Sequence, residues 1–295
     1  MTQTSAILHV GCKINLFLEI ERRRDDGYHD LRTLFFPLSE PHDTLHIVPA
    51  EQGASMLFTC SDPELENQNN IVLKAYRAFA YVSCCAPDIE VHLDKGVPSG
   101  AGLGGGSADA ARLLVHLNSL AGPRALAPER LRRLAAGLGA DVPFFLDNVP
   151  AWASGVGDML TPAPETAQLL RGTSLVLVCP DEHISTDSAY AAWDGLHEEK
   201  NCSSSPRALT SAEHLSNVPV CDRPLMLYNS FETVIFPAFP KLRLIKEHFL
   251  KEGAAAALMS GSGASLFALF RCATRAAAVA QDMQRSCPAV FVHHF

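Results

Sequence analysis

The stretch Val97-Pro98-Ser99-Gly100-Ala101-Gly102-Leu103-Gly104-Gly105-Gly106-Ser107-Ala108-Asp109-Ala110-Ala111 governs how the rest of the sequence is interpreted. Five of the seven residues from 100 to 106 are glycine, and an alanine-rich apolar pattern follows. Because glycine costs about 0.5–1 kcal/mol relative to alanine in a regular element, five together predict a loop that needs positive φ or close approach to a ligand. Backbone N–H groups at a helix N-terminus bind anions. The stretch therefore predicts a phosphate-binding loop that opens a helix at Ser107.

The first strand is predicted at residues 7–20, where apolar residues alternate with others at period two. Lys13 and Asn15 then lie side by side on the face opposite the apolar one. The pattern alone fits an exposed strand face as well as a functional pair.

The elements around the loop follow from periodicity and capping residues. The glycine loop is expected to follow a strand, and Asp141 stands at the start of an apolar segment. The expected elements are a charged turn at 21–27, strands near 31–38 and 43–49, a helix at 71–82 capped by Asn69 or Asn70, a strand at 88–95 and a helix at 128–138.

The C-terminal half alternates strands and helices in an order typical of a two-layer α+β domain with an antiparallel sheet. The expected elements are a linker at 162–172, a strand at 173–179, a short helix at 186–193, a polar mobile segment at 197–207, helices at 225–236 and 240–252, strands at 255–259 and 266–270, a helix at 273–286 and a final strand at 289–294.

Composition limits the class of protein. A chain of 295 residues exceeds the usual size of one core, so two domains are expected. A hydrophobic fraction of 47% with 19% charged residues is typical of a globular protein, and the formal charge of −8 disfavours a nucleic-acid partner. The nine cysteines are scattered without a C-x-x-C pair, so we expect reduced thiols and no metal site. Neither a secretory nor a membrane-spanning pattern is present, so a cytoplasmic protein without a membrane partner is expected.

Three common glycine loops fit poorly. A P-loop requires lysine and a hydroxyl residue after its last glycine, whereas Ser107-Ala108 follows here. The G-x-G-x-x-G pattern of dinucleotide-binding folds is met by residues 100–105, but it follows hairpin-forming strands, and the acidic residue expected about 20 positions on would be Glu129, inside a helix. The motifs of protein kinases are missing from the sequence.

The loop instead resembles that of the GHMP kinase superfamily, and within it the 4-diphosphocytidyl-2-C-methyl-D-erythritol kinase family. Five separated stretches carry the resemblance: Gly11–Leu18, Asp26–His29, the loop through Ala111, Leu138–Phe145 and Met259–Gly263. The sequence departs from the family pattern at Gly11-Cys12, where Pro-Ala is usual, and at Ser107-Ala108, where Ser-Ser is frequent. These departures concern the entry of the strand and one auxiliary hydroxyl, and neither changes Lys13 or Ser107.

The resemblance implies an α+β, two-domain GHMP kinase fold. Residues 1–160 would form a ribosomal protein S5 domain 2-like ATP-binding domain, and residues 161–295 a ferredoxin-like domain. The implied enzyme transfers phosphate from ATP, bound with Mg²⁺, to the 2-hydroxyl of the small-molecule substrate 4-diphosphocytidyl-2-C-methyl-D-erythritol, in the non-mevalonate route to isoprenoid precursors. A monomer or weak homodimer is expected.

The resemblance also implies roles for individual residues. Asp141 would be the general base and Lys13 its electrostatic partner, although Asp141 read alone is equally an N-cap. Lys95 would reach the adenosine. The ATP phosphates would be held by Pro98, Ser99, Gly100, Ala101, Gly102, Leu103, Gly104, Gly105, Gly106, Ser107 and Ala108.

The acceptor would be bound by Asn15, Tyr28, His29, Tyr190, Gly261, Ser262 and Gly263. In this interpretation Tyr28 stacks on the cytosine, with Tyr190 as a second stacking face, and His29 hydrogen-bonds the base. Without the resemblance, a buried tyrosine and a turn histidine are the simpler interpretation of Tyr28 and His29. Two other functions stay open: a different small-molecule kinase of the superfamily, and a non-catalytic nucleotide-binding protein on the same fold.

Overall fold

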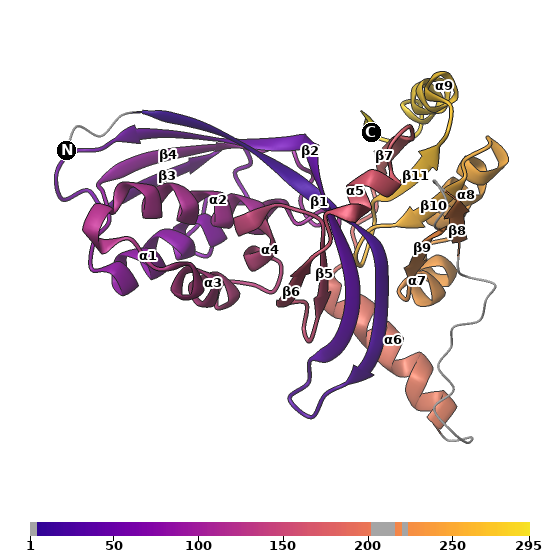
Figure 1. The fold of residues 1–295 in the computed structure, drawn as a ribbon, viewed down its shortest axis with the longest axis horizontal. Coiled ribbons are helices and arrows are strands. Elements are labelled where there is room, and N and C mark those ends of the chain that lie inside the picture. The colour runs from indigo at the N-terminus through magenta and orange to yellow at the C-terminus, as the bar shows by residue number, and fades with distance from the viewer. Residues whose placement is uncertain (1–4, 202–215, 220–223) are drawn as a thin grey trace. The chain divides into compact units, whose positions relative to one another are not determined.

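The computed structural model describes residues 5–201, 216–219 and 224–295. The chain divides into two compact units that are interleaved in the sequence (Figure 1). Unit 1 contains residues 1–13, 37–99 and 104–149, and unit 2 contains residues 14–36, 100–103 and 150–295. The division into domains at 160/161 stays a prediction.

The sheet of unit 1 is built from parts of β1 (Ala6–Arg23) and β2 (His29–Pro49) together with β3 (Met56–Cys60) and β4 (Ile89–Asp94), in the order β3-β4-β2-β1. Strand β4 pairs antiparallel with β2 and parallel with β3. Its apolar residues are buried and alternate with exposed polar ones, so only one face of the strand enters the core. Figure 1 shows the helices of the unit gathered on one side of the sheet.

Those helices are α1 (Ile71–Ser83), α2 (Gly105–Leu120), α3 (Pro128–Ala136) and α4 (Val142–Asp147), with the short 3₁₀ helix η1 (Gly122–Arg124) between α2 and α3. The Asn70 side chain caps α1 by accepting a hydrogen bond from the backbone of Val72, as predicted. Helix α2 buries three leucines at helical spacing, Leu113, Leu114 and Leu117. Burial of each is worth about 1.5–3 kcal/mol, and this anchors the helix whose N-terminus follows the glycine loop.

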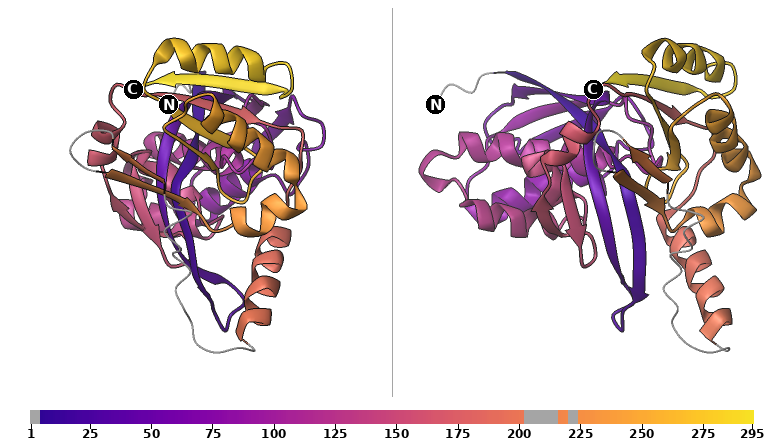
Figure 2. Two further views of the ribbon diagram at one scale, coloured as in Figure 1. Left: turned by 90° about the vertical axis from the view of Figure 1, so that its right-hand side faces the viewer. Right: turned by 45° about the vertical axis from the view of Figure 1, so that its right-hand side comes forward.

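In unit 2, β1 and β2 continue as long strands joined by a hairpin (Figure 2). The adjoining strands are β5 (Ala151–Ser154), which pairs antiparallel with β2 and β6 (Met159–Pro162), and β9 (Pro224–Asn229), which pairs parallel with β1 and antiparallel with β8 (Ser216–Pro219). Helix α5 (Glu165–Leu169) follows β6, and α6 (Thr186–Asn201) follows the next strand in the chain.

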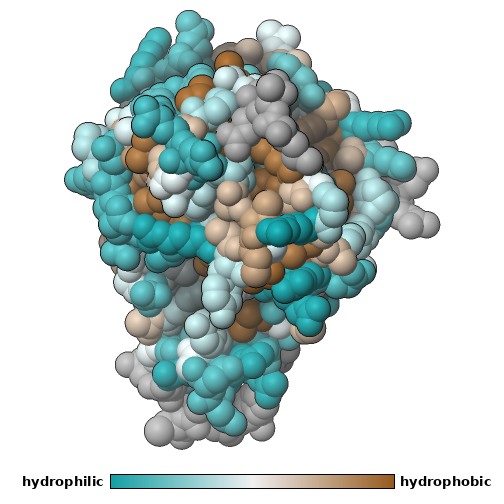
Figure 3. Space-filling model, turned by 90° about the vertical axis from the view of Figure 1, so that its left-hand side faces the viewer, coloured by the Kyte–Doolittle hydropathy of each residue, from teal (hydrophilic) through white to brown (hydrophobic). Residues whose placement is uncertain are grey.

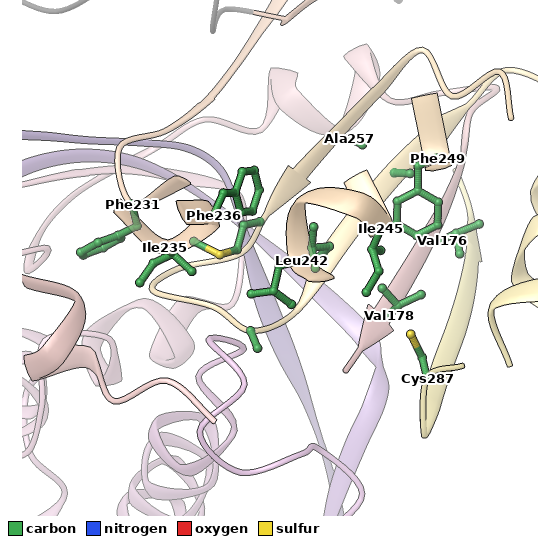
Figure 4. Close-up of a cluster of buried hydrophobic side chains, with 14 of the residues drawn as sticks. Val176, Val178, Phe231, Ile235, Phe236, Leu242, Ile245, Phe249, Ala257 and Cys287 are labelled. Atoms are coloured by element: carbon green, nitrogen blue, oxygen red, sulfur yellow. The ribbon is translucent and has the colours of Figure 1, made fainter. Parts of the chain in front are cut away.

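A second, four-stranded antiparallel sheet in unit 2 has the order β10-β11-β7-β12. Its strands are β10 (Ala256–Met259), β11 (Leu266–Phe270), β7 (Ser174–Cys179) and β12 (Ala289–His294). The helices α7 (Glu232–Ala238), α8 (Pro240–Lys251) and α9 (Ala273–Met283) pack on it through a shared apolar cluster (Figure 4). Phe249 and Leu242 of α8 are fully buried in this cluster, which also includes Val176 and Val178 of β7. The antiparallel sheet with helices packed on it confirms the expected α+β arrangement.

Several predicted elements were wrong in extent or type. The strands expected at 31–38 and 43–49 form one strand, β2, because the polar Ser39 and Glu40 are solvent-facing strand residues and do not make a turn. The helix expected at 225–236 is instead β9 followed by α7, since a short apolar run does not distinguish helix from strand. The expected linker at 162–172 contains α5.

Other differences are smaller. Helix α2 begins at Gly105, two residues before the predicted Ser107, and α6 extends to Asn201, beyond the predicted end at 193. Strands β3, β5, β6 and β8 were not predicted. The polar segment expected at 197–207 begins within α6, and from residue 202 it lies outside the described residues.

The surface facing the viewer in Figure 3 is mostly hydrophilic, with hydrophobic residues gathered near its middle. None of the described helices combines the length and the apolar character needed to cross a membrane.

Candidate active site

The glycine loop leaves the N-terminus of α2 open. Gly100, Gly102 and Gly104 have φ of +69°, +75° and +72°, in the left-handed region that side chains disfavour. Gly104 occupies the N-cap position of α2 and has no side chain to cap it. The first backbone N–H groups of a 16-residue helix therefore lack a side-chain cap, and phosphate oxygens suit them as acceptors.

Close packing explains why glycine is needed at the start of the helix. A Cβ added to Gly104 would lie 3.1 Å from the ring of Phe145 and 3.2 Å from Cε of Lys13. A Cβ on Gly105, which has helical φ, would lie 2.9 Å from Cγ1 of Val97. Two of the five glycines, Gly105 and Gly106, thus belong to the helix and not to a strained loop. At the start of α2 these glycines place no side chain between the backbone N–H groups and a bound phosphate.

Lys13 and Asp141, the predicted catalytic residues, meet in unit 1. Nζ of Lys13 lies 3.5 Å from Oδ2 of Asp141. The lysine side chain is buried, and the aspartate side chain is 31% exposed. Asp141 occupies the N-cap position of α4, as the alternative interpretation expected, but its side chain makes no capping hydrogen bond there. The buried position of Lys13 also excludes the exposed strand face considered for β1.

The other half of the glycine loop is held by the loop after β10. Oγ of Ser260 donates to the carbonyl of Gly102 at 3.2 Å, and the N–H of Ser265 donates to the carbonyl of Ala101 at 3.3 Å. A Cβ on Gly102 would lie 2.3 Å from the Ser260 carbonyl oxygen. The carbonyls of residues 101 and 102 are therefore held by one backbone and one side-chain donor within unit 2.

The predicted acceptor loop contains Gly261, Ser262 and Gly263, and the two glycines have φ of +58° and +96°. Nδ2 of Asn229 donates to the carbonyls of Met259 and Gly261, at 2.7 and 2.8 Å, and so fixes the start of this loop. Ser262 Oγ lies 3.1 Å from Oγ1 of Thr186 at the start of α6.

Asn15 is buried on β1 and reaches the same region. Its backbone N–H donates to Oγ of Ser260 at 3.4 Å, and its Nδ2 donates to Oγ1 of Thr33 at 2.7 Å. The side chain is therefore oriented by β2 while the backbone contacts the acceptor loop.

His29 and Tyr190 are brought together by β2 and α6. Their ring centroids lie 4.4 Å apart with an interplanar angle of 17°, which is a stacked pair. His29 is buried, and its Nε2 lies 2.7 Å from Oδ1 of Asp194. Tyr28 is 65% exposed, so the alternative of a buried tyrosine is wrong. Tyr190 stacks on the imidazole of His29, and its stacking on the cytosine stays a prediction.

Lys95 is directed into a buried acidic pair. Its ammonium bonds Oδ2 of Asp43 and lies 3.2 Å from Oδ2 of Asp109. Burial, the dominant cause, raises the pKa of Asp109 to about 8, while Oδ1 of Asp109 has no hydrogen-bond partner. Both aspartate side chains contact the Lys95 ammonium, and the predicted contact with adenosine stays a prediction.

The remaining residues of the predicted cradle differ in exposure. Ser99 and Gly100 are exposed, Pro98, Gly106 and Ser107 are half-buried, and Leu103 and Ala108 are buried in apolar surroundings. Leu103 and Ala108 can reach a phosphate only through their backbone. Within the described residues, no group of three or more His, Cys, Asp or Glu side chains could hold a metal ion.

Comparison with known proteins agrees with this geometry. The family model for the GHMP kinases N terminal domain matches residues 70–151, and that for the GHMP kinases C terminal matches residues 222–289. A 4-diphosphocytidyl-2-C-methyl-D-erythritol kinase of Oleidesulfovibrio alaskensis is 44% identical, with 99% of each chain covered. One of Nitratidesulfovibrio vulgaris strain DP4 is 48% identical, with 90% of each chain covered. The chain belongs to the 4-diphosphocytidyl-2-C-methyl-D-erythritol kinase family.

The solved structures agree with this family. The crystal structure of a 4-(cytidine 5'-diphospho)-2C-methyl-D-erythritol kinase matches with a TM-score of 0.76 and 30% identity, covering 97% of this chain and 98% of that one. A homoserine kinase from Cytophaga hutchinsonii shares the fold, with a TM-score of 0.68 at 17% identity. The resemblance and the two-domain GHMP kinase fold predicted from sequence are confirmed. As a member of the GHMP family, the chain is an ATP-dependent small-molecule kinase.

Three residues with clear structural parts in the site were missed by sequence reasoning: Asp194, Asn229 and Asp43. Tyr190 and Asp194 are four residues apart, so a helix continuing past 193 would have placed them on one face. The sequence prediction placed Asn229 in a helix at 225–236. Its hydrogen bonds to the loop after β10 could not be predicted from that assignment.

Proposed function

We propose that this chain phosphorylates the 2-hydroxyl of 4-diphosphocytidyl-2-C-methyl-D-erythritol with ATP, a step in the non-mevalonate route to isoprenoid precursors. The proposal rests above all on the Lys13–Asp141 pair. This pair adjoins the glycine loop, because a Cβ added to Gly104 would lie 3.2 Å from Cε of Lys13. Relatives named for this substrate, 44% and 48% identical over nearly the whole chain, support the choice of acceptor.

Asp141 is the general base. Its carboxylate is partly exposed and makes no capping bond, so it can accept the proton of an acceptor hydroxyl as the oxygen attacks phosphorus. Lys13, buried beside it, stabilises the carboxylate and then offsets the charge of the transferring phosphoryl group. Because Nζ of Lys13 lies 3.5 Å from Oδ2 of Asp141, the same ammonium can interact with this carboxylate and with the transferring phosphoryl group.

The glycine loop holds the phosphate donor. Backbone N–H groups at the start of α2 bind phosphate oxygens, and the partial positive charge of the helix end favours them. The donor, when bound, supplies the γ-phosphoryl group, and magnesium enters with the nucleotide. Gly261 and Gly263, with positive φ, form a second backbone nest for the phosphates of the acceptor.

The acceptor base is recognised in unit 2. The exposed ring of Tyr28 can stack on a cytosine ring without first leaving a packed core. His29 supplies a hydrogen bond to the edge of the base, and Tyr190 backs the imidazole. Asn15 orients the acceptor near the loop of Ser260.

The enzyme is proposed to work as a monomer or weak homodimer in the cytoplasm, without nucleic-acid or membrane partners. The formal charge of −8 supports the absence of a nucleic-acid partner, because phosphate backbones attract basic surfaces.

A coupled ADP-release assay tests the function. Purified protein with ATP, Mg²⁺ and 4-diphosphocytidyl-2-C-methyl-D-erythritol is expected to release ADP in proportion to acceptor. The same assay with 2-C-methyl-D-erythritol 4-phosphate, which lacks the cytidyl group, should give little. Equal rates with both acceptors would instead support another small-molecule kinase, and no ADP from folded protein would support a non-catalytic nucleotide-binding protein.

A further inference from the structure

The carboxylate of Asp194 faces the ring of His29 from the adjacent helix. Oδ1 of Asp194 lies 2.7 Å from Nε2 of His29, and Oδ2 lies 3.4 Å from Nε of Arg23. The imidazole side chain is 5% exposed and the carboxylate side chain 16% exposed, so the contact is largely shielded from water. The two carboxylate oxygens thus face an arginine on one side and the imidazole on the other.

The ring of His29 is held in orientation as well as in position. It stacks on Tyr190 at 4.4 Å and meets the edge of Trp193 at 5.7 Å with an interplanar angle of 89°. Tyr190, Trp193 and Asp194 all come from one face of α6, whereas His29 begins β2. The imidazole is therefore held by three side chains of a single helix.

This arrangement determines which ring nitrogen carries the proton. An ionised carboxylate can only accept a hydrogen bond, so Nε2 of His29 must donate. In a neutral imidazole the other nitrogen, Nδ1, is then a bare acceptor. Among the described residues, none hydrogen-bonds Nδ1.

We infer that Asp194 is a positioning residue that sets the base specificity of the acceptor site through His29. A bare Nδ1 accepts a hydrogen bond from the 4-amino group of cytosine, whereas the O4 of uracil is itself an acceptor and is repelled. The carboxylate thus selects cytidine over uridine without touching the base. This inference rests on the proposed function, because it takes His29 to contact the base.

The first experiment locates the proton directly. Long-range ¹H–¹⁵N spectra of the ¹⁵N-histidine-labelled protein, assigned with His29→Asn, are expected to show Nε2 protonated and Nδ1 bare. The Asp194→Asn and Asp194→Ala variants should lose this fixed tautomer. A wild-type His29 protonated on Nδ1, or on both nitrogens, would overturn the inference.

The second experiment measures selectivity without requiring turnover. Binding of cytidine diphosphate and uridine diphosphate is compared by calorimetry, and the wild type is expected to favour the cytidine ligand at least about 100-fold. Asp194→Asn should weaken cytidine diphosphate binding about tenfold, the worth of one hydrogen bond, and reduce the preference. With the full acceptor, KM should rise about tenfold while kcat changes less than about twofold.

A matched control separates this role from a structural one. Asp282, on α9 of the same unit, also contacts an imidazole, Nε2 of His248 at 3.3 Å, but it is 52% exposed. Asp282→Asn should leave the tautomer of His29 and the cytidine preference unchanged. An unchanged preference in both Asp194 variants would overturn the inference. A wild type that prefers cytidine diphosphate but gives no turnover would contradict the proposed function alone.

Discussion

The phosphate side in unit 1 and the acceptor side in unit 2 are built in different ways. In unit 1 the site consists of backbone at the start of α2 and one ion pair, Lys13 with Asp141. In unit 2 it consists of rings and polar side chains from separate elements, His29 on β2 with Tyr190 and Asp194 on α6.

The two sites should therefore fail in different ways. A backbone cradle is disturbed by an added side chain, because Gly104 has neighbours where a Cβ would stand. A side-chain cluster is disturbed by the removal of a ring or a carboxylate, and its losses should fall on acceptor binding more than on turnover. The predictions below test this contrast from the largest expected effect to the smallest.

The largest effect is expected for Asp141→Asn, which removes the proposed base but keeps the shape of the side chain. Turnover should fall by about 10²–10⁴. The variant should stay folded, but the loss of the carboxylate beside buried Lys13 should lower its thermal stability. The control is Asp147→Asn, at the end of the same helix, which loses only an exposed pair with Arg132. Near-normal turnover in the Asp141 variant would remove it from the mechanism.

Gly104→Ala should raise KM for ATP by about 10- to 100-fold, since the added methyl group displaces Lys13 or Phe145 and strains a left-handed residue. Gly172→Ala is the matched control, because Gly172 has φ of +75° with nothing within 4 Å of an added Cβ. Both variants should lose similar stability from backbone strain, about 1 kcal/mol. Equal KM for ATP in the two would show that the loop does not hold the donor.

Tyr28→Ala tests the acceptor side. Because base stacking on an aromatic ring is worth about 1–3 kcal/mol, KM for the acceptor should rise about 5- to 150-fold, with KM for ATP unchanged. Tyr81→Ala removes an exposed tyrosine, 87% accessible, from unit 1 and serves as the control. A Tyr28 variant that changes KM for ATP instead would reverse the assignment of the two sides.

The smallest effect on the two sites is expected at Asp109 in α2, where the change concerns stability. Its pKa is raised by burial from 3.8 to about 8, so between about pH 4 and 8 the native state holds a proton that the unfolded state has lost. The free energy of unfolding from this group therefore falls as pH rises through that window. Asp109→Asn should remove that fall, as measured by urea denaturation at pH 5 and 8.5. Parallel pH profiles for variant and wild type would contradict the assignment.

The sequence predicted the phosphate side more completely than the acceptor side, for physical reasons. The phosphate side consists of short contiguous motifs that contain Lys13, Asp141 and the glycines. The role of each residue could therefore be predicted from its neighbours in the sequence. The contact of Asp194 with His29 joins residues 165 positions apart, and only the packing of α6 brings them together. Likewise, the buried carboxylates around Lys95 come from a strand and a helix, and this partnership could not be inferred from a lysine placed before the loop.

The boundaries of β9 and α2 were missed for a related reason. Leu225 to Tyr228 form a short apolar run whose strand conformation is decided by pairing with β1 and not by local propensity. Gly105 and Gly106, poor helix formers, become helical because α2 is anchored by its buried leucines.

Phosphorus NMR of the reaction product tests the central claim most directly. Wild-type enzyme, ATP, Mg²⁺ and 4-diphosphocytidyl-2-C-methyl-D-erythritol should yield one new phosphomonoester signal in step with ADP. Carbon 2 of the acceptor carries a methyl group and no hydrogen, so this signal should show no coupling to a carbinol proton. ADP without a new monoester, or a monoester coupled to a carbinol proton, would contradict the account.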